Sequence, residues 1–315
     1  MKIITAHQRE LILDIGAEGL TSLPAGVLEK DLHLTEALRY LSAADTTDLQ
    51  LVFCGGTCLS KAHGIIERMS EDLDFKIIVP EGLTGNAKKK LLSNYKDILI
   101  AGFSELGFLA SKKDVVAGDG NSSMLFNLRY ESQFPQVVSL RPELKVEIHA
   151  RTPLLECQPL NIRSIADEVL ALEDSKFSIL CINVSETLAE KVLAFLRRTA
   201  QSLEFESQEE FDGRLIRHVY DVLFIHRKQP RLLKELPKGL FDQMIKADGL
   251  QYQNQYPGFL NDPKKRLLTA LDSFSDSVKS EESYQRFLAD LVYGDPISFE
   301  EARQIFIQIA KTLLS

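Results

Sequence analysis

The residues of this sequence that are best suited to catalysis or metal binding are two acidic residues separated by one apolar residue. Asp72 and Asp74 flank Leu73 and precede Phe75, an alternation typical of a strand with one buried face. Because residues two apart on a strand point to the same side, we predict that both carboxylates project from one face. Adjacent carboxylates repel each other unless a cation lies between them, and oxygen ligands favour magnesium or manganese.

A glycine pair followed by threonine precedes the acidic pair. Gly55, Gly56 and Thr57 end a short apolar run and begin a helical pattern. Glycines let a phosphate approach the backbone, the first N–H groups of a helix attract anions, and Thr57 adds a hydroxyl donor. Each motif alone is common in ordinary turns and solvated loops. Their order and spacing favour phosphoryl or nucleotidyl transfer.

A third carboxylate is expected on a neighbouring strand. In the run Lys145 to His149, alternation places Lys145, Glu147 and His149 on the face opposite Val146 and Ile148. An ordinary solvent-exposed face would show the same pattern. Beside the aspartate pair, however, Glu147 is the preferred third metal ligand, and Lys145 and His149 are interpreted as its neighbours.

The second half of the sequence carries basic and acidic residues on two helical patterns. Lys191 and Arg198, seven residues apart, lie on one flank of an apolar stripe, from which a basic pair could reach a triphosphate. A solvated flank is the more common role of such residues. Arg217 and Asp221 have the i, i+4 spacing of an intrahelical ion pair, so a structural role is the default interpretation there.

The pattern of apolar residues predicts an α+β protein in two parts. Helices are expected at 6–17, 31–43 with Asp31 as N-cap, 57–69 and 87–106, and strands at 51–54, 73–79, 124–130 and 144–148. Helical patterns then dominate at 186–200 with Ser185 as N-cap, 212–226, 264–274, 281–293, and 299–314 with Ser298 as N-cap. We therefore expect a mixed β-sheet domain with flanking helices over residues 1–160 and a mainly helical domain over 161–315.

Length and composition indicate an ordinary water-soluble protein. The 315 residues are enough for two domains, and the formal charge of −8 argues against a broadly basic nucleic-acid-binding surface. A local basic channel remains compatible with the 37 lysines and arginines. No apolar run is long enough for a signal peptide or a membrane span, so a cytoplasmic location is expected. The cysteines have no metal-binding spacing and are interpreted as reduced, buried thiols; they are Cys54, Cys58, Cys157 and Cys181.

Several motifs together resemble the AbiEii/AbiGii toxin family of nucleotidyltransferases, within the DNA polymerase β-like nucleotidyltransferase superfamily. The most specific stretch runs from Gly55 to Asp74, and the resemblance covers about residues 25–225. The matching segments are Val27–Asp31, Gly55–Gly64, Ile66–Asp74, Lys145–Ile148, Glu186–Lys191 and Arg217–Asp221.

The resemblance implies a nucleotidyltransferase-type fold and a toxin of a bacterial toxin–antitoxin or abortive-infection system. It implies metal ligation by Asp72 and Asp74, nucleotide contact by Thr57 and Lys191, and a required acidic residue at Asp221. Family members are associated with GTP binding, and some relatives add pyrimidine nucleotides to the 3′ end of tRNA. This sequence departs from the family in having Glu147 where many relatives have aspartate, and His218 where an acid is usual.

These observations lead to the hypothesis that the chain transfers a nucleoside monophosphate from an NTP to an acceptor hydroxyl, with two Mg²⁺ ions. The NTP would be GTP or a pyrimidine NTP, and a tRNA 3′ end or another RNA is a candidate acceptor. A cognate antitoxin would be encoded nearby, with its direct contact left open, and no membrane would be involved. Two alternatives remain: a nucleotide-binding regulator without turnover, and a toxin that acts through protein contacts. The expected catalytic residues are Asp72, Asp74, Glu147, Lys191 and Asp221, the metal ligands are the first three, and the nucleotide-binding residues are Gly55, Gly56, Thr57, Lys191 and Arg198.

Overall fold

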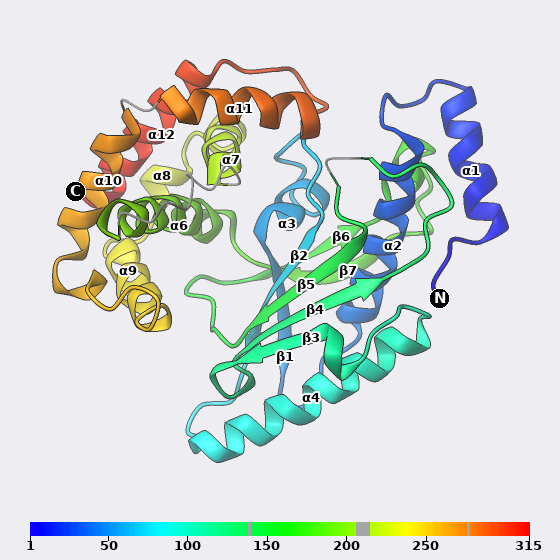
Figure 1. Cartoon of the computed structure of the whole chain (residues 1–315), viewed down its shortest axis with the longest axis horizontal. Coiled ribbons are helices and arrows are strands. Elements are labelled where there is room, and N and C mark those ends of the chain that lie inside the picture. The colour runs from blue at the N-terminus through cyan, green and yellow to red at the C-terminus, as the bar shows by residue number, and fades with distance from the viewer. Residues whose placement is uncertain (138–139, 206–214, 276–277) are drawn as a thin grey trace. The chain divides into compact units, whose positions relative to one another are not determined.

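The structure, a computed structural model, describes residues 1–137, 140–205, 215–275 and 278–315, which fall into two units (Figure 1). Unit 1 comprises Met1–Gly64 and Met69–Asn183, and unit 2 comprises Ile65–Arg68 and Val184–Ser315. Four residues of the first half of the chain therefore belong to unit 2. The sequence pattern predicts domains of residues 1–160 and 161–315, with the change of character near 155–185, and unit 1 continues to Asn183.

A seven-stranded mixed sheet forms the centre of unit 1, in the order β3-β4-β5-β2-β1-β7-β6. β2 runs parallel to β5 and β1 parallel to β7, while the other neighbouring strands are antiparallel. The four predicted strands are confirmed as β1, β2, β4 and β5. The sequence pattern misses β7 and the two edge strands β3 and β6, and the edge strands are too exposed to show a clear apolar alternation. The strands are β1 Gln50–Cys54, β2 Asp72–Ile78, β3 Val115–Gly118, β4 Ser123–Arg129, β5 Glu143–His149, β6 Gln158–Ile162 and β7 Phe177–Cys181.

The two faces of the central strands differ sharply in polarity. Leu73 and Phe75 of β2 and Val146 and Ile148 of β5 are buried, while the residues between them are half-buried. Helices α2 and α4 cover the apolar face, where Phe103 of α4 stacks edge-on against Phe126 of β4 and Tyr40 of α2. The opposite face is left for the polar residues of β2 and β5.

The helices of unit 1 confirm some sequence predictions and correct two. The prediction of Asp31 as an N-cap is wrong, because α2 starts at Ala25 and buries Asp31 in an ion pair with Lys61. The helix predicted at 57–69 ends at Lys61, because Gly64 adopts a φ of +61° and Arg68 forms an isolated β-bridge with Val292. The helices are α1 Ala6–Ala17, α2 Ala25–Ser42, α3 Gly55–Lys61, α4 Gly85–Glu105 and α5 Ile165–Val169.

Unit 2 is helical, as the sequence predicts for this half of the chain. Its core includes Phe195, Phe274 and Phe306, whose ring centroids lie 4.7–5.5 Å apart. Ser298 caps α12 as predicted, but Ser185 is not an N-cap because α6 already includes Val184. The first residues of the helix predicted at 212–226 lie outside the described residues. The helices are α6 Val184–Glu204, α7 Ile216–Lys228, α8 Leu232–Glu235, α9 Leu240–Gln251, α10 Pro263–Ser275, α11 Val278–Leu291 and α12 Phe299–Leu314.

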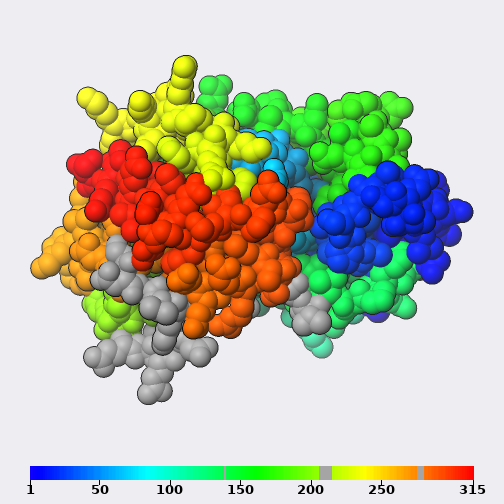
Figure 2. Space-filling model, turned by 90° about the horizontal axis from the view of Figure 1, so that it is seen from above, coloured from blue at the N-terminus to red at the C-terminus, as the bar shows by residue number. Residues whose placement is uncertain are grey.

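The last helices of unit 2 contribute to its surface. Figure 2 shows residues of α11 and α12, in orange and red, across the viewed face of this unit. Within the described ranges, every helix falls short of the length or apolar content that crossing a lipid bilayer requires.

Candidate functional site

The register of the central strands brings the three predicted carboxylates onto one face of the sheet. Asp74 of β2 is the direct partner of Glu147 in parallel β5, and of Cys54 in antiparallel β1. Asp72 is the partner of Lys145. Because paired residues on neighbouring strands point to the same side, Asp72, Asp74 and Glu147 share the half-buried polar face.

The glycine turn packs directly against this face. Gly55 has a φ of +77°, in the left-handed region that favours glycine. A Cβ added to Gly55 would lie 2.8 Å from both Cβ and Cγ of Asp74, closer than van der Waals contact allows. The turn therefore needs glycine for its backbone conformation and also for the space that the Asp74 carboxylate occupies.

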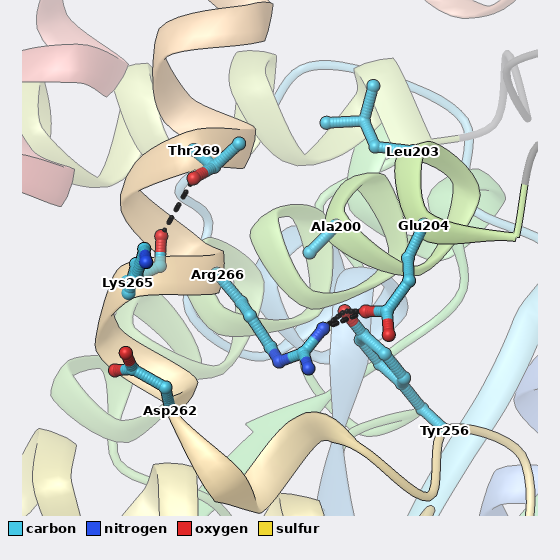
Figure 3. Close-up of a pocket in the computed structure, with 8 residues that line it drawn as sticks. All are labelled: Ala200, Leu203, Glu204, Tyr256, Asp262, Lys265, Arg266 and Thr269. Carbon is cyan, nitrogen blue, oxygen red and sulfur yellow. Dashed lines mark hydrogen bonds and ion pairs between the residues drawn. The ribbon is translucent and has the colours of Figure 1, made fainter.

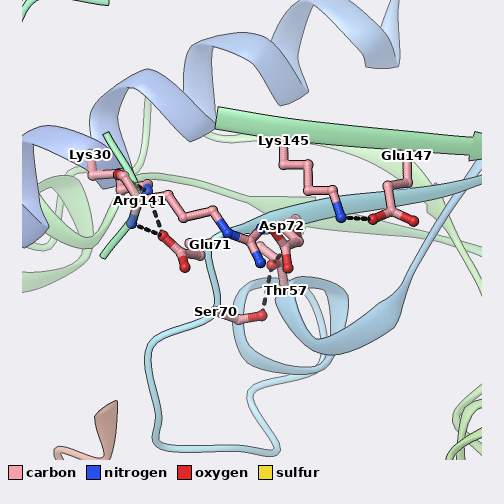
Figure 4. Close-up of polar contacts among 8 residues, drawn as sticks. All are labelled: Lys30, Thr57, Ser70, Glu71, Asp72, Arg141, Lys145 and Glu147. Carbon is pink, nitrogen blue, oxygen red and sulfur yellow. Dashed lines mark hydrogen bonds and ion pairs between the residues drawn. The ribbon is translucent and has the colours of Figure 1, made fainter. Parts of the chain in front are cut away.

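Thr57 connects the same turn to the start of β2. Its side chain is fully buried. Its hydroxyl donates a hydrogen bond to the carbonyl oxygen of Asp72 at 2.5 Å, and its oxygen lies 3.0 Å from Oγ of Ser70, within hydrogen-bond distance (Figure 4). These bonds fix α3 against the strand that carries the aspartates. Direct contact between Thr57 and a nucleotide stays a prediction.

Basic side chains contact two of the three carboxylates. The Nη1 atom of Arg141 lies 2.5 Å from Oδ1 of Asp72, and Lys145 forms an ion pair with Glu147 (Figure 4). Burial and the neighbouring Glu71 and Glu147 raise the pKa of Asp72, and Arg141 only partly opposes this. In contrast, the His149 imidazole, 3.7 Å away, and the Lys145 ammonium lower the pKa of Glu147 to about 2. Glu147 is thus an anion at all ordinary pH values.

The donor chemistry of this face suits a hard divalent cation. Three carboxylates on two adjacent strands offer the oxygen ligands that Mg²⁺ prefers, and their partial burial makes a compensating positive charge favourable. The side chains of Asp72 and Glu147 are turned toward Arg141 and Lys145, respectively. Accordingly, the described residues contain no group of three acidic, histidine or cysteine side chains already placed as metal ligands. Metal binding therefore requires side-chain rotation at Asp72 and Glu147, both of which retain partial solvent exposure.

Lys191 and Asp221 lie together inside unit 2. The Nζ atom of Lys191 is 2.6 Å from Oδ2 of Asp221, and Arg68 donates to both carboxylate oxygens at 2.7 and 2.8 Å. Asp221 is fully buried; burial raises its pKa, but the two cations outweigh this and hold it well below its usual range. Asp221 can thus act on a substrate only through its partners. Arg198, on the same helix as Lys191, is exposed.

Sequence reasoning misses four charged residues that the structure joins to these sites. Arg141 contacts Asp72, and its backbone contacts Lys30 and Glu71. Arg68 joins the Lys191–Asp221 pair. A usable signal is the charged triplet at 29–31, which is flanked by Val27, Leu28 and Leu32. Three consecutive charges on a helix with an apolar stripe cannot all face solvent.

A pocket of about 390 Å³ lies elsewhere, between α6 and α10 of unit 2 (Figure 3). Glu204 accepts a hydrogen bond from the Tyr256 hydroxyl at 2.6 Å and forms an ion pair with Arg266 at this pocket. The lining residues all belong to unit 2 and include none of the predicted catalytic or nucleotide-binding residues. The pocket is therefore not the site predicted from the sequence.

Comparisons with known proteins match the chain to a family and to solved structures, of which MenT4 is an example. The model of the family described as "Nucleotidyl transferase AbiEii toxin, Type IV TA system" matches residues 37–305. MenT4, a nucleotidyltransferase toxin from Mycobacterium tuberculosis H37Rv, is similar at 22% sequence identity over 69% of this chain and 71% of that chain, with a TM-score of 0.42. No functionally curated protein matches.

Proposed function

Because the chain belongs to the AbiEii nucleotidyl transferase toxins of type IV toxin–antitoxin systems, we propose that the polar face of β2 and β5 is its catalytic centre. Family membership makes the chain a nucleotidyltransferase with an NTP substrate and a cognate antitoxin. The acceptor, the metal and the residue roles are our proposal. The proposed reaction is attack of an acceptor hydroxyl on the α-phosphate of the NTP, with release of pyrophosphate.

The pairing of Asp74 with Glu147 is the observation that carries this assignment. It places a carboxylate of β5 beside the aspartates of β2, and the Gly55 turn lies against Asp74. Asp72, Asp74 and Glu147 would hold two Mg²⁺ ions. When bound, Mg²⁺ lowers the pKa of the attacking hydroxyl and stabilises charge on the phosphate oxygens.

The nucleotide would bind at the turn formed by Gly55, Gly56 and Thr57. Support comes from the contact of this turn with Asp74, since a phosphate bound there would lie beside the carboxylates. Lys191 and Asp221 are assigned from the family resemblance, and Arg198 from its spacing seven residues after Lys191 in the sequence. Lys191 would contact the nucleotide, Arg198 would add positive charge, and Asp221 would hold Lys191 in place through their ion pair.

We propose GTP or a pyrimidine NTP as the nucleotide and an RNA, with a tRNA 3′ end as the first candidate, as the acceptor. The test incubates the chain with each of the four α-labelled NTPs, total RNA or tRNA, and Mg²⁺. Labelled RNA is expected with at least one NTP, and removal of the metal with EDTA should abolish the product.

Two variants sharpen this experiment. Asp74→Ala should form no labelled product, whereas Asp114→Ala, which removes a carboxylate paired with exposed Arg129 at 2.6 Å, should keep wild-type activity. Absence of labelled RNA with all four NTPs, with either Mg²⁺ or Mn²⁺, would contradict RNA as the acceptor. Growth inhibition that survives both Asp72→Ala and Asp74→Ala would instead indicate a toxin acting through protein contacts.

A further inference from the structure

The backbone of Arg141 is held on both sides by a buried ion pair. Lys30 of α2 and Glu71, the residue before β2, lie 2.5 Å apart with side chains only 1% and 7% exposed. Oε2 of Glu71 accepts the Arg141 N–H at 2.9 Å, and Nζ of Lys30 donates to the Arg141 carbonyl at 2.7 Å. Both polar backbone groups of this residue are therefore fixed by one buried clamp, which we define as Lys30 and Glu71.

The clamp directs the Arg141 side chain toward the proposed catalytic face. Figure 4 shows the side chain extending from the clamp to Asp72 and Thr57. Its contact with Asp72 uses Nη1, and the side chain remains 24% exposed. A guanidinium carries five N–H donors in a planar fork, so donors remain for a second oxyanion.

Stability alone is a poor reason for such a clamp. A buried lysine and glutamate must both lose their hydration, and well-packed apolar residues at similar positions are often as stable or more stable. What the pair does provide is a fixed position for one backbone segment. The residue fixed in this way is an arginine whose charged end lies on the polar face, a quarter exposed to solvent.

We propose that Arg141 is a substrate-binding residue that contacts phosphate oxygens, and that Lys30 and Glu71 are its positioning residues. This inference rests on the proposed function, because the phosphates belong either to the NTP or to the RNA acceptor. Both offer the oxygen pairs that a guanidinium fork binds best. The contact with Asp72 places the Arg141 guanidinium beside the proposed catalytic carboxylates.

The experiment measures binding, so it does not depend on turnover. Affinities of wild type and Arg141→Gln are measured for inorganic tripolyphosphate, for each NTP, and for tRNA without NTP. Loss of a charge-assisted contact should weaken binding on the order of 10- to 100-fold. Arg141→Lys, which keeps the charge but not the fork, should recover only part of this loss. Arg129→Gln on β4, which removes an exposed arginine paired with Asp114, is the matched control and should bind as wild type.

A second set of variants, made in Asp72→Asn, distinguishes two roles of Arg141: binding phosphate, or only neutralising the charge of Asp72. If Arg141 contacts phosphate, Arg141→Gln should weaken binding also in Asp72→Asn, where no carboxylate charge is left to neutralise. If the loss disappears in Asp72→Asn, or if no ligand binds more weakly to Arg141→Gln, the proposal is overturned. A loss for tripolyphosphate and NTP assigns the contact to the triphosphate, and a loss confined to tRNA assigns it to the acceptor.

The positioning role is tested by combining variants. Glu71→Gln alone should weaken binding of the same ligand. When it is combined with Arg141→Gln, the affinity should fall by less than about twofold relative to Arg141→Gln alone, because Glu71 would act only through Arg141. Fully additive losses would refute the clamp. If the wild-type chain transfers label to RNA and Arg141→Gln binds normally, this inference fails while the proposed function stands. If tripolyphosphate binding depends on Arg141 but no nucleotide is transferred, the proposed function fails while phosphate binding by Arg141 stands.

Discussion

The Cα atom of Gly55 and the carboxylate of Asp74 occupy adjoining space, and no side chain larger than hydrogen fits between them. Gly55 has a φ of +77°, and a Cβ on it would overlap the Asp74 side chain. The first motif of the sequence and its acidic pair are thus in direct contact, although many residues separate them in the chain. This contact couples the shape of the turn to the orientation of the carboxylate.

Gly55→Ala should abolish nucleotidyl transfer by displacing Asp74. Gly82 is the matched control because it also has a φ of +77° but has open space around its Cα. Left-handed backbone costs alanine roughly 1–2 kcal/mol, so Gly82→Ala should lose stability to that extent, and Gly55→Ala should lose more because its Cβ also overlaps Asp74. Only Gly55→Ala should also lose activity, measured as labelled RNA. Equal activity of the two variants would show that the contact with Asp74 is not needed for catalysis.

Glu147→Gln should reduce kcat by at least about 100-fold, because it removes an anionic metal ligand while keeping the size of the side chain. Glu143 lies on the same strand and face, four residues earlier. Its partner in β4 is Arg129, whereas Glu147 is paired with Asp74 of β2. Glu143→Gln should therefore keep kcat within about twofold. The measurement is the initial rate at saturating NTP over a series of Mg²⁺ concentrations. If Glu147→Gln transfers nucleotides like wild type, two carboxylates are sufficient.

Local pattern was enough to predict the polar face. Alternation along β2 and β5 places Asp72, Asp74 and Glu147 correctly, because a strand with one buried face has a strict period of two. The edge strands β3 and β6 escape prediction because exposure removes that period.

Long-range ion pairs could not be predicted in the same way. Asp31 looks like an N-cap in sequence, yet it is the buried partner of Lys61. Arg68 lies four residues before Asp72 but pairs with Asp221, which no local spacing indicates. A buried charge gives no sign in the sequence of which distant residue neutralises it, so the clamp around Arg141 also appears only in three dimensions.

His33 should make the chain lose stability in acid. Burial, together with the charge of Lys2, lowers its folded-state pKa from 6.5 to about 4. The unfolded chain then binds a proton that the folded chain does not, so stability present above pH 6.5 is lost as the pH falls toward 4. The loss is about 3 kcal/mol. Urea unfolding at pH 7.5 and 4 should show a smaller acid effect in His33→Phe, whereas exposed His7→Phe should follow wild type.

Asp221→Asn should destabilise unit 2 more than any single loss of its partners. The variant leaves Arg68 and Lys191 buried without their shared anion, and breaking such a pair typically costs about 3–5 kcal/mol. In Lys191→Met the two hydrogen bonds from Arg68 still neutralise Asp221, so the cost should be nearer to 1–2 kcal/mol. Lys191→Met should therefore lose activity at nearly full stability, if Lys191 contacts the nucleotide.

The comparison of Asp221→Asn with Lys191→Met needs a measurement of stability that is specific to unit 2. Hydrogen exchange of the α6 and α7 amides reports on this unit, and far-UV circular dichroism follows the whole chain, which contains no tryptophan. Asp242→Asn, which removes an exposed ion pair with Lys264, is the control and should change stability by less than about 1 kcal/mol. If Asp221→Asn exchanges no faster than Lys191→Met, Asp221 does not hold unit 2 together. Its requirement would then have to arise from the position that it gives Lys191.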